Sequence, residues 1–192
     1  MNVGVLALQG DFREHIAALA ECGINASAVK TAAEINAIDG LIIPGGESTT
    51  MSKLAKSFGL FERIKERIAS GLPTYGSCAG MIMLAREIKD PASGQETFGG
   101  IDIVVERNAF GRQVDSFEED LNIKGLNGGE FRAVFIRAPW VSKLGKAVEV
   151  LAEIDGHAVA VREKNVLATS FHPELTHDFR IHKFFVDEIC SK

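Results

Sequence analysis

The chain has 192 residues, of which 46% are hydrophobic, and it carries a formal net charge of −5. This length predicts one domain over residues 1–192 with a sizeable core. The acidic balance argues against binding nucleic acid or membranes through general electrostatics. No basic residue precedes the apolar run at Val3–Leu8, as it would in a signal peptide, and the three cysteines form no C-x-x-C pair. We therefore expect no signal peptide and a reducing, cytoplasmic location.

The chain begins with alternating strand and helix patterns. Short apolar runs predict strands buried on both faces, and apolar residues at helical spacing predict amphipathic helices between them. The expected elements are strands at Val3–Leu8, Ala26–Lys30 and Leu41–Ile43, a helix at Phe12–Cys22, and a short helix after the capping-box sequence Thr31–Glu34. This order predicts an α/β fold: a doubly wound, mostly parallel, flavodoxin-like sheet with helices on both faces.

A glycine-containing loop, Pro44–Thr50, follows the third expected strand. Its glycines free the backbone, and we expect its hydroxyls to cap a helix at Met51–Ala55. The loop lacks the lysine that completes a phosphate-binding P-loop, because Lys53 lies too far along the chain. It is better suited to contacting a substrate. A further helix is expected at Phe58–Ser70.

Cys78 lies in the sequence Gly76-Ser77-Cys78-Ala79-Gly80, between an extended segment and an apolar helix. The G-x-C-x-G pattern is the thiol counterpart of the G-x-S-x-G elbow, a sharp turn that presents a nucleophile. A helix that begins at Ala79 would direct unpaired N–H groups toward the sulfur and stabilise a thiolate or an oxyanion. The alternative is a buried cysteine that acts only as a small hydrophobic residue. The two glycines favour a nucleophile.

The second half of the chain predicts further strands. A polar loop at Lys89–Gly100 precedes a strand at Ile101–Glu106, and the turn-rich segment Asn108–Gly129 predicts a small β insertion. Asp155-Gly156 is a strong two-residue hairpin signal. The remaining expected elements are strands at Ala133–Ala138, Val148–Ile154, His157–Arg162 and Val166–Ser170, and a closing helix at Thr176–Cys190.

His172 and Glu174 are candidates to activate Cys78. Pro173 keeps His172 out of helical conformation, so we expect an extended segment in which His172 and Glu174 share a side. Glu174 would then accept from one ring nitrogen while the other faces Cys78. The alternative is a surface His-Pro-Glu turn that caps the last helix. Because strand ends gather at one edge of a parallel sheet, we favour catalysis.

Other polar residues indicate a binding site without a metal. His172, His177 and His182 recur every five residues, which turns about 140° per step on a helix and does not gather them on one face. We therefore expect no metal site. Arg107 and Arg137 each end an apolar run, as expected of cations at the rim of a pocket, although each is also compatible with an ordinary solvated arginine.

With these motifs the chain resembles the class I, triad-type glutamine amidotransferases, and more narrowly the glutaminase subunits of two-component pyridoxal 5′-phosphate synthases. The matching stretches are Leu6–Gly10, Pro44–Met51, Gly76–Gly80, Val105–Glu118, Phe135–Pro139 and Ser170–Thr176. They span the chain from end to end. Ser77 and Trp140 depart from the family pattern, in which Thr and His are common.

The resemblance implies that the chain hydrolyses L-glutamine to glutamate and ammonia through a thioester at Cys78, with His172 moving protons and Glu174 orienting His172. It implies substrate contacts at Gly46, Glu47, Ser48, Arg107, Ile136 and Arg137, and an oxyanion site formed by the amides of Gly46 and Ala79. It implies no metal or organic cofactor.

The resemblance also implies a partner, a (βα)₈-barrel synthase subunit that consumes the ammonia for vitamin B6. Two other functions remain open from the residues themselves. The chain is compatible with another thiol hydrolase, such as an intracellular cysteine peptidase, or with a non-enzymatic thiol sensor.

Overall fold

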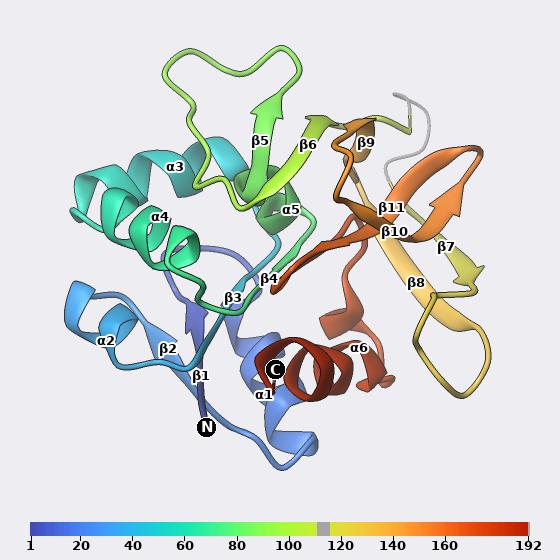
Figure 1. The fold of residues 1–192 in the computed structure, drawn as a ribbon, viewed down its shortest axis with the longest axis horizontal. Helices are drawn as coiled ribbons and strands as arrows, with labels where there is room; N and C mark the ends of the chain where they lie inside the picture. The colour runs from blue at the N-terminus through green and yellow to red at the C-terminus, as the bar shows by residue number, and fades with distance from the viewer. Residues whose placement is uncertain (111–115, 192) are drawn as a thin grey trace.

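The computed structural model describes residues 1–110 and 116–191 (Figure 1). Residues 111–115, which belong to the Val105–Glu118 stretch singled out in the sequence, lie outside the described residues. Among the residues described, no helix is long and apolar enough to cross a membrane.

The N-terminal part forms the expected alternation of strands and helices. β1, β2, β3 and β4 are parallel neighbours within the order β2-β1-β3-β4-β12. The bounds are β1 Asn2–Leu6, α1 Phe12–Glu21, β2 Asn25–Val29, α2 Ala32–Asn36, β3 Gly40–Ile43, α3 Ser48–Ser57, α4 Phe61–Ala69, β4 Thr74–Ser77 and α5 Ala79–Leu84. The capping box at Thr31 and Glu34 is present.

The sheet continues past β12 with mainly antiparallel pairs, and β7 and β8 form a separate two-stranded hairpin. The bounds are β5 Ala85–Ile88, β6 Ile101–Glu106, β7 Ser116–Leu121, β8 Phe131–Ile136, β9 Trp140–Leu144, β10 Glu149–Ile154, β11 His157–Glu163, β12 Val166–Thr169, η1 Pro173–Leu175, α6 Arg180–Phe184 and the π-helical η2 Phe185–Cys190. The α/β class, the small β insertion and the Asp155-Gly156 hairpin are confirmed.

The sheet divides the core in two. Alternate residues of β3 show this division, because Leu41 and Ile43 pack in one apolar cluster with α2, α3, α4 and α5, whereas Ile42 packs in the other. The second cluster includes side chains of α1, α6 and the β7–β8 hairpin. Figure 1 shows α1 and α6 together on one side of the sheet and α3, α4 and α5 on the other. Helices therefore cover both faces, as predicted.

Several predicted boundaries were wrong for local reasons. The helix expected at Met51–Ala55 begins at Ser48, because the carboxylate of Glu47, rather than a hydroxyl, caps it by accepting from two backbone N–H groups. The helix expected at Phe58–Ser70 begins at Phe61, since Gly59 at φ +67° separates it from α3. The strands β5 and β9 were missed.

The closing helix expected at Thr176–Cys190 also begins later, at Arg180. The Thr176 hydroxyl accepts from the Asp178 N–H at 3.2 Å, and an Asp178 carboxylate oxygen accepts from the Arg180 N–H at 3.1 Å. These side chains satisfy backbone donors locally and keep residues 176–179 in turns.

Candidate active site

Cys78 occupies a sharp turn between β4 and α5, as the G-x-C-x-G pattern predicted. Its backbone has φ 49° and ψ −102°, a conformation that is rare for a residue with a side chain. Its N–H donates to the carbonyl of Thr169 at 2.8 Å, which ties the turn to the neighbouring strand β12. Its side chain is largely buried, and Sγ lies 3.8 Å from the carbonyl oxygen of Ile136. The surroundings hold the thiol in one place.

The two glycines beside Cys78 are required by close packing. A Cβ built on Gly80 would lie 2.1 Å from the carbonyl oxygen of Ile43, and one on Gly76 would lie 2.5 Å from the backbone of Gly80. No side-chain adjustment relieves a clash with backbone atoms. The elbow therefore forms because α5 starts in direct contact with β3 and β4.

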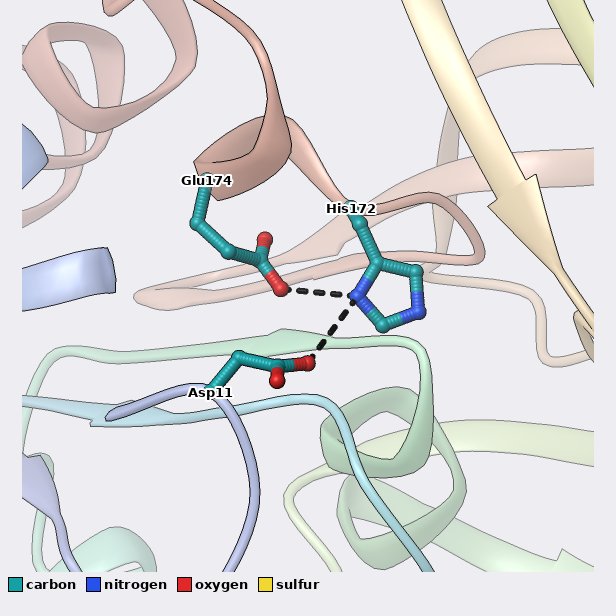
Figure 2. A group of neighbouring side chains, drawn as sticks. All are labelled: Asp11, His172 and Glu174. Carbon is teal, nitrogen blue, oxygen red and sulfur yellow. Dashed lines mark hydrogen bonds and ion pairs between the residues drawn. The ribbon is translucent and has the colours of Figure 1, made fainter. Parts of the chain in front are cut away.

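His172 and Glu174 lie together beside this elbow. Nδ1 of His172 donates to Oε1 of Glu174 at 2.7 Å, and Asp11 Oδ2 approaches the same nitrogen at 3.6 Å (Figure 2). The second ring nitrogen points away from both carboxylates in this view (Figure 2). Cys78 and His172 line the same cavity. The expected grouping of Cys78, His172 and Glu174 is thus present in space.

The local conformation differs from the extended segment that we expected. Pro173–Leu175 forms a single 3₁₀ turn, and Glu174 reaches back to His172 from within it. The backbone N–H of His172 donates to Val134 on β8 at 2.9 Å. A Cβ on Gly45 would lie 2.3 Å from the His172 ring, so the glycine loop packs directly against the imidazole.

The environment shifts the pKa of each partner. Burial by itself lowers the pKa of His172, but hydrogen bonds to Cys78 and Glu174 outweigh it and raise the pKa to about 10. Burial raises the pKa of Glu174, and the hydrogen bond to His172 opposes that rise. At neutral pH His172 therefore favours the protonated, imidazolium form.

A cavity of about 420 Å³ opens beside Cys78 and His172. All six residues expected to contact a substrate line it, and Ala79, buried at the start of α5, does not. Asp11, Ile82 and Asn108 also line it and were missed by sequence reasoning. The full set of lining residues is Asp11, Gly46, Glu47, Ser48, Cys78, Ile82, Arg107, Asn108, Ile136, Arg137 and His172.

The Gly46-Glu47 loop is held by side chains at both ends. Gln9 donates to the carbonyl of Glu47 at 3.3 Å and accepts from the Glu47 N–H at 3.2 Å. The carboxylate of Glu47 accepts from the N–H groups of Thr49 and Thr50 and from the Thr50 hydroxyl. Partial burial opposes ionisation of Glu47, but these hydrogen bonds lower its pKa to about 2. The cavity therefore has a fixed negative charge on one wall.

Arg107 supplies a positive charge and is also held in position. It donates to Gln95 Oε1 at 3.2 Å and to the carbonyl of Asp90 at 3.1 Å. Gln95 is buried and also donates to the Ser48 hydroxyl at 2.9 Å, so it connects two lining residues. Sequence reasoning placed Gln95 in a polar loop and missed this role, because only the fold brings that loop to α3.

Asp11, His172 and Glu174 form the one group among the described residues that offers three ligand atoms close enough together for a metal ion. His172 Nδ1 already donates to Glu174 at 2.7 Å, so a cation there would replace the proton of that hydrogen bond. The arrangement fits a hydrogen-bonded His–carboxylate pair.

Comparisons with known proteins identify the fold and the family. A solved structure described as a glutamine amidotransferase matches this chain with a TM-score of 0.92 and 50% identity, covering 99% of both chains. The fold is that of the class I glutamine amidotransferases.

The chain belongs to the SNO glutamine amidotransferase family, whose model matches residues 5–191. Curated relatives named "Pyridoxal 5'-phosphate synthase subunit PdxT" are similar over nearly their whole length. The relative from Mycolicibacterium vanbaalenii is 60% identical over 96% of both chains, and the one from Streptomyces griseus is 59% identical over 97% of this chain and 95% of its own. The resemblance stated from the sequence is confirmed.

Proposed function

We propose that this chain hydrolyses L-glutamine to L-glutamate and ammonia with Cys78 as nucleophile, His172 as base and Glu174 as its orienting acceptor. The observation that carries the proposal is the shared cavity: Cys78 on a strained elbow and His172, fixed by a buried carboxylate, line the same space. Membership of a glutamine amidotransferase family supports the same chemistry.

The reaction follows the acyl-transfer pattern of a nucleophile, a base and a carboxylate that orients the base. The thiol proton of Cys78 moves to Nε2 of His172, whose raised pKa favours the imidazolium form that results, and Cys78 Sγ attacks the side-chain amide carbon of glutamine. The tetrahedral oxyanion is stabilised by the N–H groups of Gly46 and Ala79. Its collapse breaks the C–N bond, and the nitrogen leaves as ammonia with the proton returned by His172. Water, deprotonated by His172, then cleaves the glutamyl thioester and restores Cys78.

The charges of the cavity suit a free amino acid. Arg107 and Arg137 line it, and their guanidinium groups are proposed to pair with the α-carboxylate, while Glu47 is proposed to offset the α-ammonium group. Ser48 and Ile136 complete the proposed contacts. No metal or organic cofactor enters the chemistry.

The ammonia is proposed to pass to a second chain that uses it to build pyridoxal 5′-phosphate. The curated relatives are named as subunits of a pyridoxal 5′-phosphate synthase, which supports this assignment. From the family resemblance we propose a (βα)₈-barrel synthase as the partner. Its docking would complete the oxyanion site through movement of the Gly45-Gly46 peptide, where Gly46 has φ +139°.

The proposed location is the cytoplasm, where thiols stay reduced. Residues 1–192 are proposed to act as one glutaminase domain.

The test measures glutamate release by the wild-type chain and by Cys78→Ser, each alone and with the synthase subunit. The wild type alone should be slow, and the synthase should raise kcat at least about tenfold by completing the site. Cys78→Ser should bind glutamine but lose hydrolysis by several orders of magnitude, because a hydroxyl is a far poorer nucleophile here. Near-normal release by Cys78→Ser would exclude the proposed nucleophile, and a wild-type rate that the synthase leaves unchanged would exclude gating. A peptide substrate run in parallel distinguishes a peptidase.

A further inference from the structure

A chain of buried polar side chains lies behind Glu174, on the side away from the cavity. Nε2 of His182 in α6 is 2.9 Å from Nδ1 of His15 in α1. Nε2 of His15 is in turn 3.0 Å from the Ser77 hydroxyl and 3.4 Å from Oε2 of Glu174. His15, His182 and Ser77 are fully buried. His15 thus contacts both the residue before Cys78 and the carboxylate that holds His172.

Both histidines of this chain are neutral at neutral pH. Burial lowers the pKa of His15, and the neighbouring His182 lowers it further. Burial lowers the pKa of His182 to about 4. Each ring therefore carries one N–H, and the hydrogen bond between the rings needs one donor and one acceptor.

The surroundings select one of the two possible arrangements. If His182 Nε2–H donates to His15 Nδ1, then His15 carries its proton on Nε2, facing Ser77 and Glu174. The atom left over is Nδ1 of His182, which has no hydrogen-bond partner among the described residues and would be only an unused acceptor. The opposite arrangement buries an N–H without an acceptor and turns a nitrogen lone pair toward the carboxylate. We assign the first arrangement on this ground.

Glu174 needs such a donor. Its Oε1 accepts from His172, whereas Oε2 is buried and has no close hydrogen bond, with the His15 nitrogen beside it. The other titratable groups around this carboxylate are Asp11 and the phenol of Tyr75, whose hydroxyl is bonded to Thr169 at 2.8 Å. His15 is therefore the neutral donor placed to stabilise the charge on Glu174.

We propose that His15 is a positioning residue of the glutaminase, in which a neutral Nε2–H, fixed by His182, holds the Glu174 carboxylate and the Ser77 end of the elbow in the geometry that His172 requires. This role rests on the proposed Cys78–His172–Glu174 chemistry. His15 does not line the cavity, so it acts on the chemical step and leaves glutamine binding unchanged.

Two substitutions of matched polarity test the proposal. The amide nitrogen of His15→Gln reaches the position of ring Nε2, whereas that of His15→Asn reaches only the position of Nδ1. His15→Asn should lower kcat about tenfold to a hundredfold, with the KM for glutamine unchanged, because the N–H that faces the Glu174 carboxylate and bonds Ser77 is lost. His15→Gln should restore most of kcat.

The pH profile separates positioning from mere support of the fold. Without its donor Glu174 binds a proton more readily, so the acid limb of kcat/KM should move to higher pH in His15→Asn and stay in place in His15→Gln. Equal losses of kcat in both variants with unmoved profiles would overturn the proposal. Cys78→Ser is measured beside them: if it keeps its activity, the triad assignment fails, and if it is inactive while His15→Asn behaves as wild type, only this inference fails.

A second measurement needs no variant. Nitrogen chemical shifts of the wild-type protein labelled with ¹⁵N-histidine report which ring nitrogen of His15 carries the proton. We expect the Nε2–H form at neutral pH. A proton on Nδ1 would overturn the proposal, since His15 would then have nothing to donate to Glu174.

Discussion

At the scale of single residues, backbone strain gathers at the cavity. Cys78, Asn108 and Arg137 all line it and all have positive φ, at 49°, 49° and 43°. Such conformations persist only where surrounding contacts impose them, and they concentrate at functional sites. Arg107 reaches the cavity without this strain and is held instead by Gln95 and Asp90. The side chain of Arg107 is thus held in position by protein contacts.

Arg107→Ala should raise the KM for glutamine about tenfold to a hundredfold, because it removes a charge-assisted contact worth roughly 1.5–3 kcal/mol. kcat should change little, since Arg107 is assigned to binding. Steady-state kinetics of glutamate release measure both values. Arg86→Ala, at an exposed arginine paired with Asp102, is the control and should leave KM unchanged. An unchanged KM in Arg107→Ala would contradict the assignment of Arg107 to glutamine binding.

At the scale of elements, the site depends on how closely α5 approaches the sheet. The first turn of α5 contacts the end of β3 through Gly80 and the end of β4 through Gly76. The backbone of Cys78 is also tied to β12. Three parallel strands therefore fix the elbow, and the histidine-bearing segment leaves the third of them.

Gly80→Ala tests this packing, because the change in the free energy of unfolding should have the opposite sign to that of an ordinary Gly→Ala substitution in a helix. Alanine in place of glycine inside a helix normally stabilises a protein by about 0.5–1 kcal/mol. Here the added Cβ meets the backbone of Ile43, so we expect destabilisation of about 1–3 kcal/mol, as for other overpacked sites. Urea unfolding gives the free-energy change. A more stable variant would show that the helix start tolerates a side chain.

At the scale of the whole molecule, the sheet separates two environments. On one side α3, α4 and α5 contribute to one apolar cluster. On the other, α1 and α6 bring His15 and His182 together under β4, although 167 residues separate them. Burial of neutral histidines links the stability of the fold to pH.

We expect the folded protein to lose stability as pH falls from about 6.5 to about 4 because of His182. Its folded pKa is depressed, so only the unfolded chain binds the proton in this window, and the loss reaches about 3 kcal/mol. His15 acts in the same direction. His172, whose folded pKa is raised, contributes stability below about 6.5 that is lost as pH rises through about 10.

Urea unfolding across this pH range, compared between wild type and His182→Gln, isolates the contribution of His182. The variant should show a shallower fall in the free energy of unfolding below pH 6.5. His177→Gln, at a histidine outside the buried chain, is the control and should keep the wild-type slope. Parallel curves for wild type and His182→Gln would contradict the prediction.

The family, the α/β class and the grouping of Cys78, His172 and Glu174 could be predicted from the sequence, because they rest on local chemistry. Gly76 and Gly80 signal an elbow, Pro173 keeps His172 out of helical conformation, and apolar runs predict parallel strands whose ends meet. All six expected substrate contacts lie at the cavity for the same reason, since each lies at the end of a strand or in the loop or helix start that follows a strand. Their roles in binding stay predictions.

Only the tertiary structure decided what supports these residues. Gln9, Asp11 and Gln95 carry no local signal, because their partners lie on segments that are distant in the chain. His15 and His182 fall within helical patterns where a histidine is an ordinary residue, and only the packing of α1 against α6 joins them behind Glu174. Sequence periodicity determines which face of a helix is buried. Which polar atoms meet inside is decided by how the helices and the sheet pack, because each buried polar group must find its partner there.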